Sequence, residues 1–267
     1  MENRKEILSC AYSTCPNDTF AFCRLAQEPD LEIHLHDVET LNRLAFEETF
    51  DVTKLSFHAW LLLRDKYQLL SVGAALGRGC GPLVIAPKAQ SLKPIVSIAI
   101  PGEFTTAHLL LRLWNPEIKN RIFMPFDRIM DAVASGKADA GVIIHEGRFV
   151  FEGRGFQCLE DLGDWWERET GLPIPLGCIA ARKSLGAERI AEFEVRLKGS
   201  IQAAFDDPAS TSEYVKTHAQ ELDDEVIRKH IETYVNAFTL NLGDEGYAAV
   251  ERLQQMAEEA GVVAFCC

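Results

Sequence analysis

The hydrophobic positions of this chain follow two periods, and stretches of one period alternate with stretches of the other. Short apolar runs rich in β-branched residues predict strands, and apolar residues at three- and four-residue spacing predict helices. The predicted strands lie near residues 7–12, 31–38, 50–55, 69–74, 83–86, 95–100, 122–124, 138–144, 158–162 and 176–181. The predicted helices between them lie near residues 19–27, 39–48, 59–67, 105–114 and 127–134. Alternating strands and helices are typical of an α/β fold.

The last part of the chain carries only the helical pattern. Helices are predicted near residues 187–205, 212–219, 223–238 and 244–260. Asp223 and Asp244 are suited to begin two of them, because an aspartate side chain accepts hydrogen bonds from the first-turn amides. We expect this helical C-terminal part to pack on the first of two lobes.

A weak internal repeat supports the expectation of two lobes. A strand, a polar turn and a helix follow one another through residues 13–19 and again through residues 101–106. In each half an aspartate, Asp51 or Asp139, precedes a strand that ends in polar groups. Two similar α/β halves that present polar loops suggest two lobes facing a cleft.

The repeat also suggests where the lobes begin and end. The first lobe is expected to comprise residues 1–88 and 180–267, and the second lobe residues 96–177. Two crossing segments, near residues 87–94 and 179–182, would then form the hinge.

Composition narrows the class of protein. The 267 residues, 47% of them hydrophobic, are enough for a sizeable core, and no apolar run is long enough for a membrane helix. The short apolar run after the charged N-terminus does not fit a secretory signal, so we expect a cytoplasmic protein. The sequence does not indicate an oligomeric state.

Charge and cysteine usage restrict the partners. A net charge of −13 disfavours nucleic acid as a partner, because a basic surface is needed to meet phosphates. An anionic ligand would therefore need local groups to capture it. The eight cysteines show no zinc spacing, and His34 and His36 on one strand face lack a third ligand, so no metal site is predicted.

His145 is the most distinctive candidate for chemistry. It follows the apolar run at residues 142–144, which predicts a buried parallel strand, so it should lie at the carboxyl edge of a sheet. Ligands of open α/β sheets bind outside that edge. Histidine is suited to act as an acid or base near neutral pH, but a structural histidine bonded to a carbonyl fits the same pattern.

Two further groups of residues should lie near strand ends. Lys54 and Ser56 end a predicted strand, although Lys54 could equally be a surface lysine. Thr105 and Thr106 stand at a helix start, where hydroxyls and free amides suit a carboxylate. A simple threonine N-cap explains the same position.

Several short segments resemble one enzyme family in the same order and over nearly the whole chain. They are Cys15-Pro16-Asn17-Asp18-Thr19-Phe20, Asp37-Val38-Glu39-Thr40-Leu41-Asn42, Thr53-Lys54-Leu55-Ser56, residues 73–82, Thr105-Thr106-Ala107, Ile143-Ile144-His145-Glu146 and Tyr234-Val235-Asn236-Ala237-Phe238. With these segments the chain resembles the 1,4-dihydroxy-6-naphthoate synthases of the futalosine pathway to menaquinone.

The resemblance implies a two-lobe periplasmic-binding-protein-like fold of type II in an intracellular enzyme. It implies cleavage of cyclic dehypoxanthinylfutalosine to 1,4-dihydroxy-6-naphthoate with release of dihydroxyacetone. The family's proton-accepting histidine falls on His145, and its substrate contacts fall on Lys54, Leu55, Ser56, Thr105 and Thr106. The resemblance implies no metal and no organic cofactor.

Two alternatives remain open from the sequence. The first is a non-catalytic protein of the same fold that binds or senses a small anionic solute. The second is chorismate dehydratase, from another branch of the same pathway. A transport binder should carry a signal peptide, and a histidine at the cleft edge favours an enzyme, so we expect the synthase.

Overall fold

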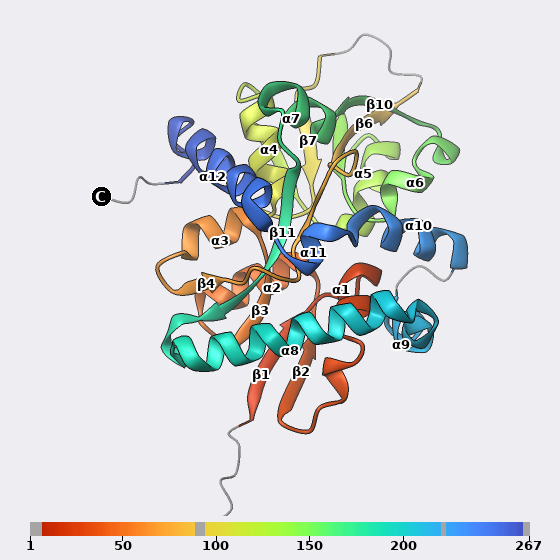
Figure 1. The fold of residues 1–267 in the computed structure, drawn as a ribbon. Helices are drawn as coiled ribbons and strands as arrows, with labels where there is room; N and C mark the ends of the chain where they lie inside the picture. The colour runs from red at the N-terminus through yellow and green to blue at the C-terminus, as the bar shows by residue number, and fades with distance from the viewer. Residues whose placement is uncertain (1–6, 89–93, 220–222, 264–267) are drawn as a thin grey trace, which may run out of the picture. The chain divides into compact units, whose positions relative to one another are not determined.

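The computed structural model describes residues 7–88, 94–219 and 223–263 (Figure 1). Its residues form two compact units. The first unit comprises Met1–Ala75 and Gly177–Gly243, and the second comprises Leu76–Leu176 and Asp244–Cys267. No helix among the described residues is long and apolar enough to cross a membrane.

The first unit is built on a mixed sheet in the order β2-β1-β3-β11-β4, with β5 also paired to β11. β1 is parallel to both β2 and β3, so the chain leaves these three strands at one edge of the sheet. β11 runs antiparallel to β3. The bounds are β1 Leu8–Tyr12, β2 Leu31–Leu35, β3 Val52–Ser56, β4 Tyr67–Leu69, β5 Ala75–Gly77 and β11 Ile174–Arg182.

Helices cover this sheet. α8 crosses β1 and β2 in Figure 1, and its apolar stripe, including Ile190, Phe193 and Leu197, packs into the core with Tyr12 and Ile179. The bounds are α1 Pro16–Phe22, α2 Val38–Phe46, α3 Phe57–Leu63, α8 Ala187–Asp206, α9 Ser212–His218, α10 Asp224–Tyr234 and α11 Ala237–Leu240.

The second unit has its own sheet, in the order β10-β6-β9-β7-β8. β7 is parallel to β8 and to β9, whereas β6 is antiparallel to β9 and β10. The strands are β6 Leu83–Pro87, β7 Ser97–Ile100, β8 Asn120–Phe123, β9 Ala140–Ile143 and β10 Phe156–Asp161. The helices are α4 Thr106–Trp114, α5 Ile129–Ala134, α6 Gly147–Val150, α7 Leu162–Thr170 and α12 Gly243–Glu259.

A glycine lets α5 pack directly on the middle of this second sheet. A Cβ atom on Gly141 of β9 would lie 2.4 Å from Cγ2 of Ile129 and 3.0 Å from Cγ2 of Val133. Real side chains do not approach so closely, so any larger residue would push α5 off the sheet. This contact holds β9, and with it the segment that leads to His145.

The strand and helix pattern of the sequence matches the structure closely, with differences at the ends of elements. The helix expected near residues 19–27 begins at Pro16, so Asp18 lies inside α1. Asp223 caps α10 as expected, but Asp244 lies within the first turn of α12. β9 was expected to be parallel, and it is parallel to β7 but antiparallel to β6.

The division into units differs from the expected ranges 1–88, 96–177 and 180–267. The first division falls between Ala75 and Leu76, because the following strand, β6, pairs with β9 and β10 of the second sheet. The second falls between Leu176 and Gly177, within β11. A third falls after Gly243, so α12 belongs to the second unit and not to the first lobe.

Candidate functional site

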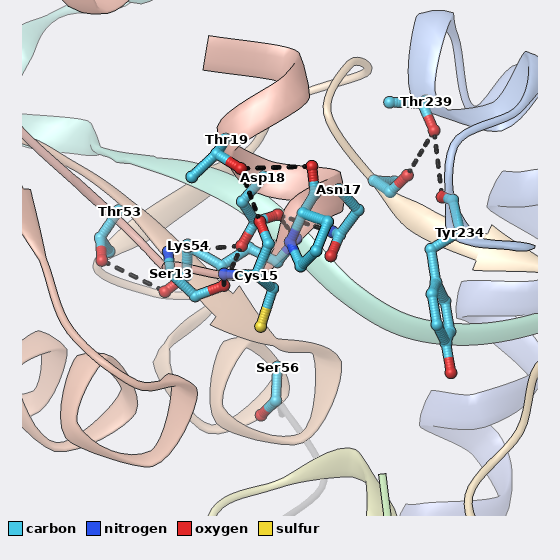
Figure 2. A network of polar contacts seen from close by, with 12 residues as sticks. Ser13, Cys15, Asn17, Asp18, Thr19, Thr53, Lys54, Ser56, Tyr234 and Thr239 are labelled. Atoms are coloured by element: carbon cyan, nitrogen blue, oxygen red, sulfur yellow. Dashed lines mark hydrogen bonds and ion pairs between the residues drawn. The ribbon is translucent and has the colours of Figure 1, made fainter. Parts of the chain in front are cut away.

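A buried ion pair lies at the carboxyl edge of the first sheet. Nζ of Lys54, on β3, lies 2.5 Å from Oδ1 of Asp18, on α1 (Figure 2). The two side chains are only 6% and 3% exposed. Lys54 is therefore not the surface lysine that its sequence position allowed. Breaking such a pair by removing one partner is strongly destabilising, because the other charge stays buried.

The fold makes room for the lysine stem through a glycine on the neighbouring strand. Gly177 of β11 lies opposite Ser56 of β3. A Cβ atom on Gly177 would lie 3.0 Å from Cε of Lys54, so the absence of a side chain there lets the lysine cross the strand. A residue larger than glycine would press on the ion pair.

Asp18 organises the turn that follows β1. Its Oδ2 accepts hydrogen bonds from Oγ of Ser13 at 2.6 Å and from the Ser13 backbone N–H at 3.3 Å. Its Oδ1 accepts from Nδ2 of Asn17 at 2.8 Å, and Oγ of Ser13 accepts from the Cys15 N–H at 3.2 Å. Figure 2 shows Asp18 surrounded by these partners. The carboxylate of Asp18 thus ties the start of this turn, at Ser13, to the first turn of α1.

Asn17 connects this turn to the helical part of the first unit. Its Oδ1 lies 3.0 Å from Nε2 of His230, a buried residue on α10. Because the Asn17 amide nitrogen donates to Asp18, its oxygen faces the histidine, and Nε2 of His230 must carry the hydrogen. The carboxamide orientation is therefore fixed from both sides.

The other expected contacts on β3 have structural partners of their own. Leu55 is fully buried in the core. Oγ of Ser56 accepts from the Ala59 N–H at 2.9 Å, which caps α3, and its backbone N–H donates to Oδ1 of Asn42 at 3.0 Å. Of Leu55 and Ser56, Ser56 is the residue with a polar side chain, and it ends the strand.

The carboxyl edge of the second sheet collects the remaining candidates. Three adjacent parallel strands, β9, β7 and β8, end at this edge. His145 follows β9, Thr105 and Thr106 follow β7, and Phe126 follows β8. The sequence predicted this edge for His145, and the strand order brings the threonines to the same edge. Ligands of such sheets bind at carboxyl edges.

Both threonine hydroxyls are engaged in hydrogen bonds. Oγ1 of Thr105 accepts from the His108 N–H at 3.2 Å and donates to the Gly102 carbonyl at 3.0 Å, so Thr105 is the N-cap of α4. Oγ1 of Thr106 donates to the Leu176 carbonyl at 2.7 Å. An incoming carboxylate must therefore rotate a hydroxyl or use the amides of the first turn.

His145 is half-buried and has an unusual backbone. Its φ angle is 55°, in the left-handed region that only a few residue types enter readily. Its ring lies edge-on to the ring of Phe126, with centroids 5.0 Å apart and planes inclined by 60°. β9 ends at Ile143, so the strand alternation used to orient Glu146 does not extend to it; Glu146 lies in the turn before α6.

Further polar and aromatic residues of the second unit have structural partners. Trp166 is fully buried, and its Nε1 donates to the Pro173 carbonyl, so it is a core residue. Arg148 pairs with Asp161, and Arg78 pairs with Glu245. Among the described residues no group of His, Cys, Asp and Glu is suited to hold a metal ion.

Sequence reasoning missed several residues at these edges. Asp18 and Asn42 were named only within the segments that carry the family resemblance, and Phe126 and His230 carried no local signal. Their roles depend on partners far away in the chain, which no spacing rule detects. The one available sign for Asp18 was its place in a polar turn between a predicted strand and a predicted helix.

A model of the family described as "Menaquinone biosynthesis" matches residues 8–259. The chain is 43% identical to the 1,4-dihydroxy-6-naphthoate synthase of Streptomyces coelicolor, over 97% of this chain and 95% of that protein. It is 45% identical to the synthase of the same name from Thermus thermophilus, with 97% of each chain covered.

Two solved structures are similar to this chain to different degrees. A protein from Archaeoglobus fulgidus matches with a TM-score of 0.90 and 37% identity, over 98% of this chain and 100% of that chain. The periplasmic aliphatic sulphonate binding protein of Escherichia coli matches with a TM-score of 0.65 over 97% and 89% of the chains. At 11% identity the second likeness shows the fold alone, and it confirms the expected α/β periplasmic-binding-protein-like fold.

Proposed function

Because the chain belongs to the menaquinone-biosynthesis family, we propose that it acts as a 1,4-dihydroxy-6-naphthoate synthase. In the proposed reaction cyclic dehypoxanthinylfutalosine is cleaved to 1,4-dihydroxy-6-naphthoate and dihydroxyacetone. The names and near-complete coverage of the two bacterial relatives support this choice. The observation that links this activity to particular residues is that His145, Thr105 and Thr106 lie at the same edge of one sheet.

In this proposal His145 is the general base that begins the reaction. Neutral imidazole takes a proton from the substrate, and the electrons released move toward the new aromatic ring as the bond to the departing three-carbon fragment breaks. The gain of aromaticity supplies the driving force, so the protein mainly starts proton loss and orients the substrate. Neither a metal ion nor an organic cofactor is part of the proposed reaction.

Anion capture is assigned to the start of α4. The substrate carries an aromatic carboxylate, and the chain carries a net charge of −13, so a local trap is needed. The positive end of the α4 dipole and the first-turn amides favour a negative group at that position. Thr105 and Thr106 would add hydroxyl donors once their present hydrogen bonds rotate away. A substrate contact at Ser56, at the end of β3, stays a prediction.

Purified protein incubated with cyclic dehypoxanthinylfutalosine tests the proposal directly. Appearance of naphthoate absorbance, with one equivalent of dihydroxyacetone, is the expected result. Binding without turnover would instead identify a solute-binding or sensing protein of the same fold. Conversion of chorismate would identify the dehydratase of the same pathway. A cytoplasmic location and a small anionic molecule as the partner remain predictions.

A further inference from the structure

The backbone of His145 lies in a turn between two elements of the second unit. β9 ends at Ile143, and α6, which begins at Gly147, is a single helical turn, too short to be stable on its own. The φ angle of His145 is 55°, a conformation that is unfavourable for a residue with a Cβ atom, so the surrounding structure has to maintain it. The direction of the His145 ring therefore depends on what holds the start of α6.

Arg148, the second residue of α6, contacts both His145 and two neighbouring segments. Its backbone N–H donates to the His145 carbonyl at 3.3 Å. Its guanidinium donates from Nη1 to the Gly81 carbonyl at 2.5 Å and from Nη2 to Oδ2 of Asp161 at 2.6 Å. The side chains of Arg148 and Asp161 are only 17% and 15% exposed. A charge-assisted pair of this kind, largely shielded from water, fixes the guanidinium in one orientation.

The two acceptors lie beside the first residue of β6. Leu83 of β6 pairs with Ile143 of β9 on one side and with Asp161 of β10 on the other. Gly81 comes two residues before Leu83 in the chain. The side chain of Arg148 therefore joins the segment that follows β9 to the start of β6 and to the end of β10.

The acceptors of Arg148 are themselves held by other contacts. Oδ1 of Asp161 accepts from the N–H groups of Gly163 at 2.8 Å and of Asp164 at 3.3 Å, so Asp161 is the N-cap of α7. A Cβ atom on Gly81 would lie 2.2 Å from the backbone nitrogen of Gly163, so these two segments pack backbone against backbone. Arg148 therefore donates to acceptors that cannot follow a movement of α6.

We propose that Arg148 is a positioning residue for His145 and holds the turn from which its ring reaches the proton of the substrate. The inference rests on the proposed function, since it concerns the residue assigned as the base. A misplacement of about 1 Å can lower a rate about 10²-fold, so loss of Arg148 should appear in kcat. KM should change little, because the carboxylate of the substrate is assigned to the start of α4.

The test measures steady-state kinetics on cyclic dehypoxanthinylfutalosine. Arg148→Met should lower kcat about 10- to 100-fold and keep KM within about threefold of the parent. Arg148→Lys should recover part of the loss, because its ammonium group reaches one of the two acceptors. Asp161→Asn keeps an oxygen for the cap of α7 but loses the acceptor for Arg148, so it should also lower kcat. It carries the test if Arg148→Met does not fold, and a parental kcat in the folded variant overturns the proposal.

A double-variant cycle separates positioning of His145 from a general loss of structure. If Arg148 acts through His145, Arg148→Met should lower the residual kcat of His145→Asn by less than about twofold. If the two losses multiply instead, Arg148 acts independently of His145 and the proposal is overturned.

Arg154→Met is the matched control. Arg154 lies in the short helical turn after α6, and its Nη2 is 2.6 Å from Oδ1 of Asp131. These side chains are 45% and 60% exposed, and the variant should keep kcat and KM within about threefold of the parent. Equal losses of kcat in Arg154→Met and Arg148→Met would show a general structural effect and contradict the positioning role.

Parental protein in the same assay separates the levels of inference. If it forms no naphthoate, the proposed function fails before any variant is compared. If it does and His145→Asn turns over equally fast, the assigned base fails. If His145→Asn is impaired and Arg148→Met keeps the parental kcat, only the positioning role fails. Urea unfolding of each variant shows whether a kinetic loss is a loss of folded protein.

Discussion

The two units begin their sheets with the same arrangement and end them with different ones. In the first unit Asp51 accepts from the N–H and hydroxyl of Ser9; in the second, Asp139 accepts from the same groups of Ser97, at 2.8 and 2.9 Å. The spacing from serine to aspartate is 42 residues in both. The weak repeat in the sequence therefore corresponds to a serine–aspartate contact that both units have at the amino ends of two paired parallel strands. We call this contact the shared corner.

At the carboxyl ends the resemblance stops. β3 carries a buried lysine paired to an aspartate, whereas β9 is apolar to its end at Ile143 and is followed by His145. Amino ends of strands lie away from ligands, and carboxyl ends face them. The shared corner therefore serves the fold, while the divergent edges carry the groups assigned to chemistry.

The largest effect should come from the edge of the second unit. His145→Asn should lower kcat about 10²- to 10⁴-fold while leaving folding and substrate binding intact, because it removes a positioned base and no packing contact of comparable size. The parental kcat should also fall in acid, because a protonated imidazole cannot accept a proton from the substrate. Initial-rate assays of naphthoate formation measure both.

Glu146→Gln is the matched control for His145. It changes the neighbouring residue in the same turn and should cost far less than tenfold in kcat. Near-parental turnover by His145→Asn would limit His145 to a structural role. The base would then have to be sought among Cys15, His58 and His108, and both of these histidines are buried.

The next effect concerns anion capture in the second unit. Thr106→Val should raise KM about 10- to 100-fold, the cost of losing one hydrogen bond to a charged group. Thr106→Ser keeps the hydroxyl and is the control. Titration with a benzoate-like inhibitor measures the binding part alone. Equal affinity of the valine variant and the parent would contradict the assignment.

Each corner should contribute to the free energy of unfolding through the hydrogen bonds to its serine. Asp139→Ala should lower the free energy of unfolding by about 1–3 kcal/mol, because two donors of Ser97 lose their acceptor. Asp51→Ala should cost more, since it also leaves Arg182 without its partner. Urea unfolding with kcat/KM in parallel tests this: stability should fall and kcat/KM per folded molecule should not. A loss of activity in either variant would contradict the conclusion that these corners serve the fold alone.

How much of the fold and of the site could be predicted from the sequence depends on how far apart in the chain the interacting residues lie. Strands and helices follow from local periodicity, and His145 could be placed at an edge because a strand directly precedes it. The unit boundary could not be placed, because it depends on β6 pairing with β9 and β10. Burial of Lys54 likewise requires Asp18 and Gly177, which only the folded sheet brings together.

The smallest expected effect is a different dependence of stability on pH in the two units. Burial lowers the pKa of His108 on α4, and the charges of Arg121 and Arg112 reinforce it against a hydrogen bond to the Glu103 carbonyl. Near pH 6.5 this histidine therefore binds a proton in the unfolded chain but not in the folded chain. The free energy of unfolding falls as pH drops below about 6.5. His108→Gln should flatten that decline.

The first unit should respond at lower pH. Burial alone would raise the pKa of Asp51, but hydrogen bonds from Ser9 and Arg182 outweigh it and hold the pKa below its usual range. The stability that Asp51 contributes is complete above the unfolded pKa, about 4, and is lost as pH falls toward the folded pKa. Asp51→Asn should remove this acid decline and leave the decline due to His108. Urea midpoints from pH 3 to 8 measure both, and identical profiles for the two variants would contradict the assignment.

The place of β11 in the first sheet has a consequence for synthesis. β3 pairs on one side with β1 and on the other with β11, which begins more than a hundred residues later, and α8, which covers the same sheet, comes later still. All five strands of the second sheet lie between Leu83 and Asp161. As the chain emerges from the ribosome, the second sheet has all of its strands before β3 has its second neighbour. The sheet of the first unit, whose first strands are synthesised earliest, is therefore completed after the sheet of the second unit.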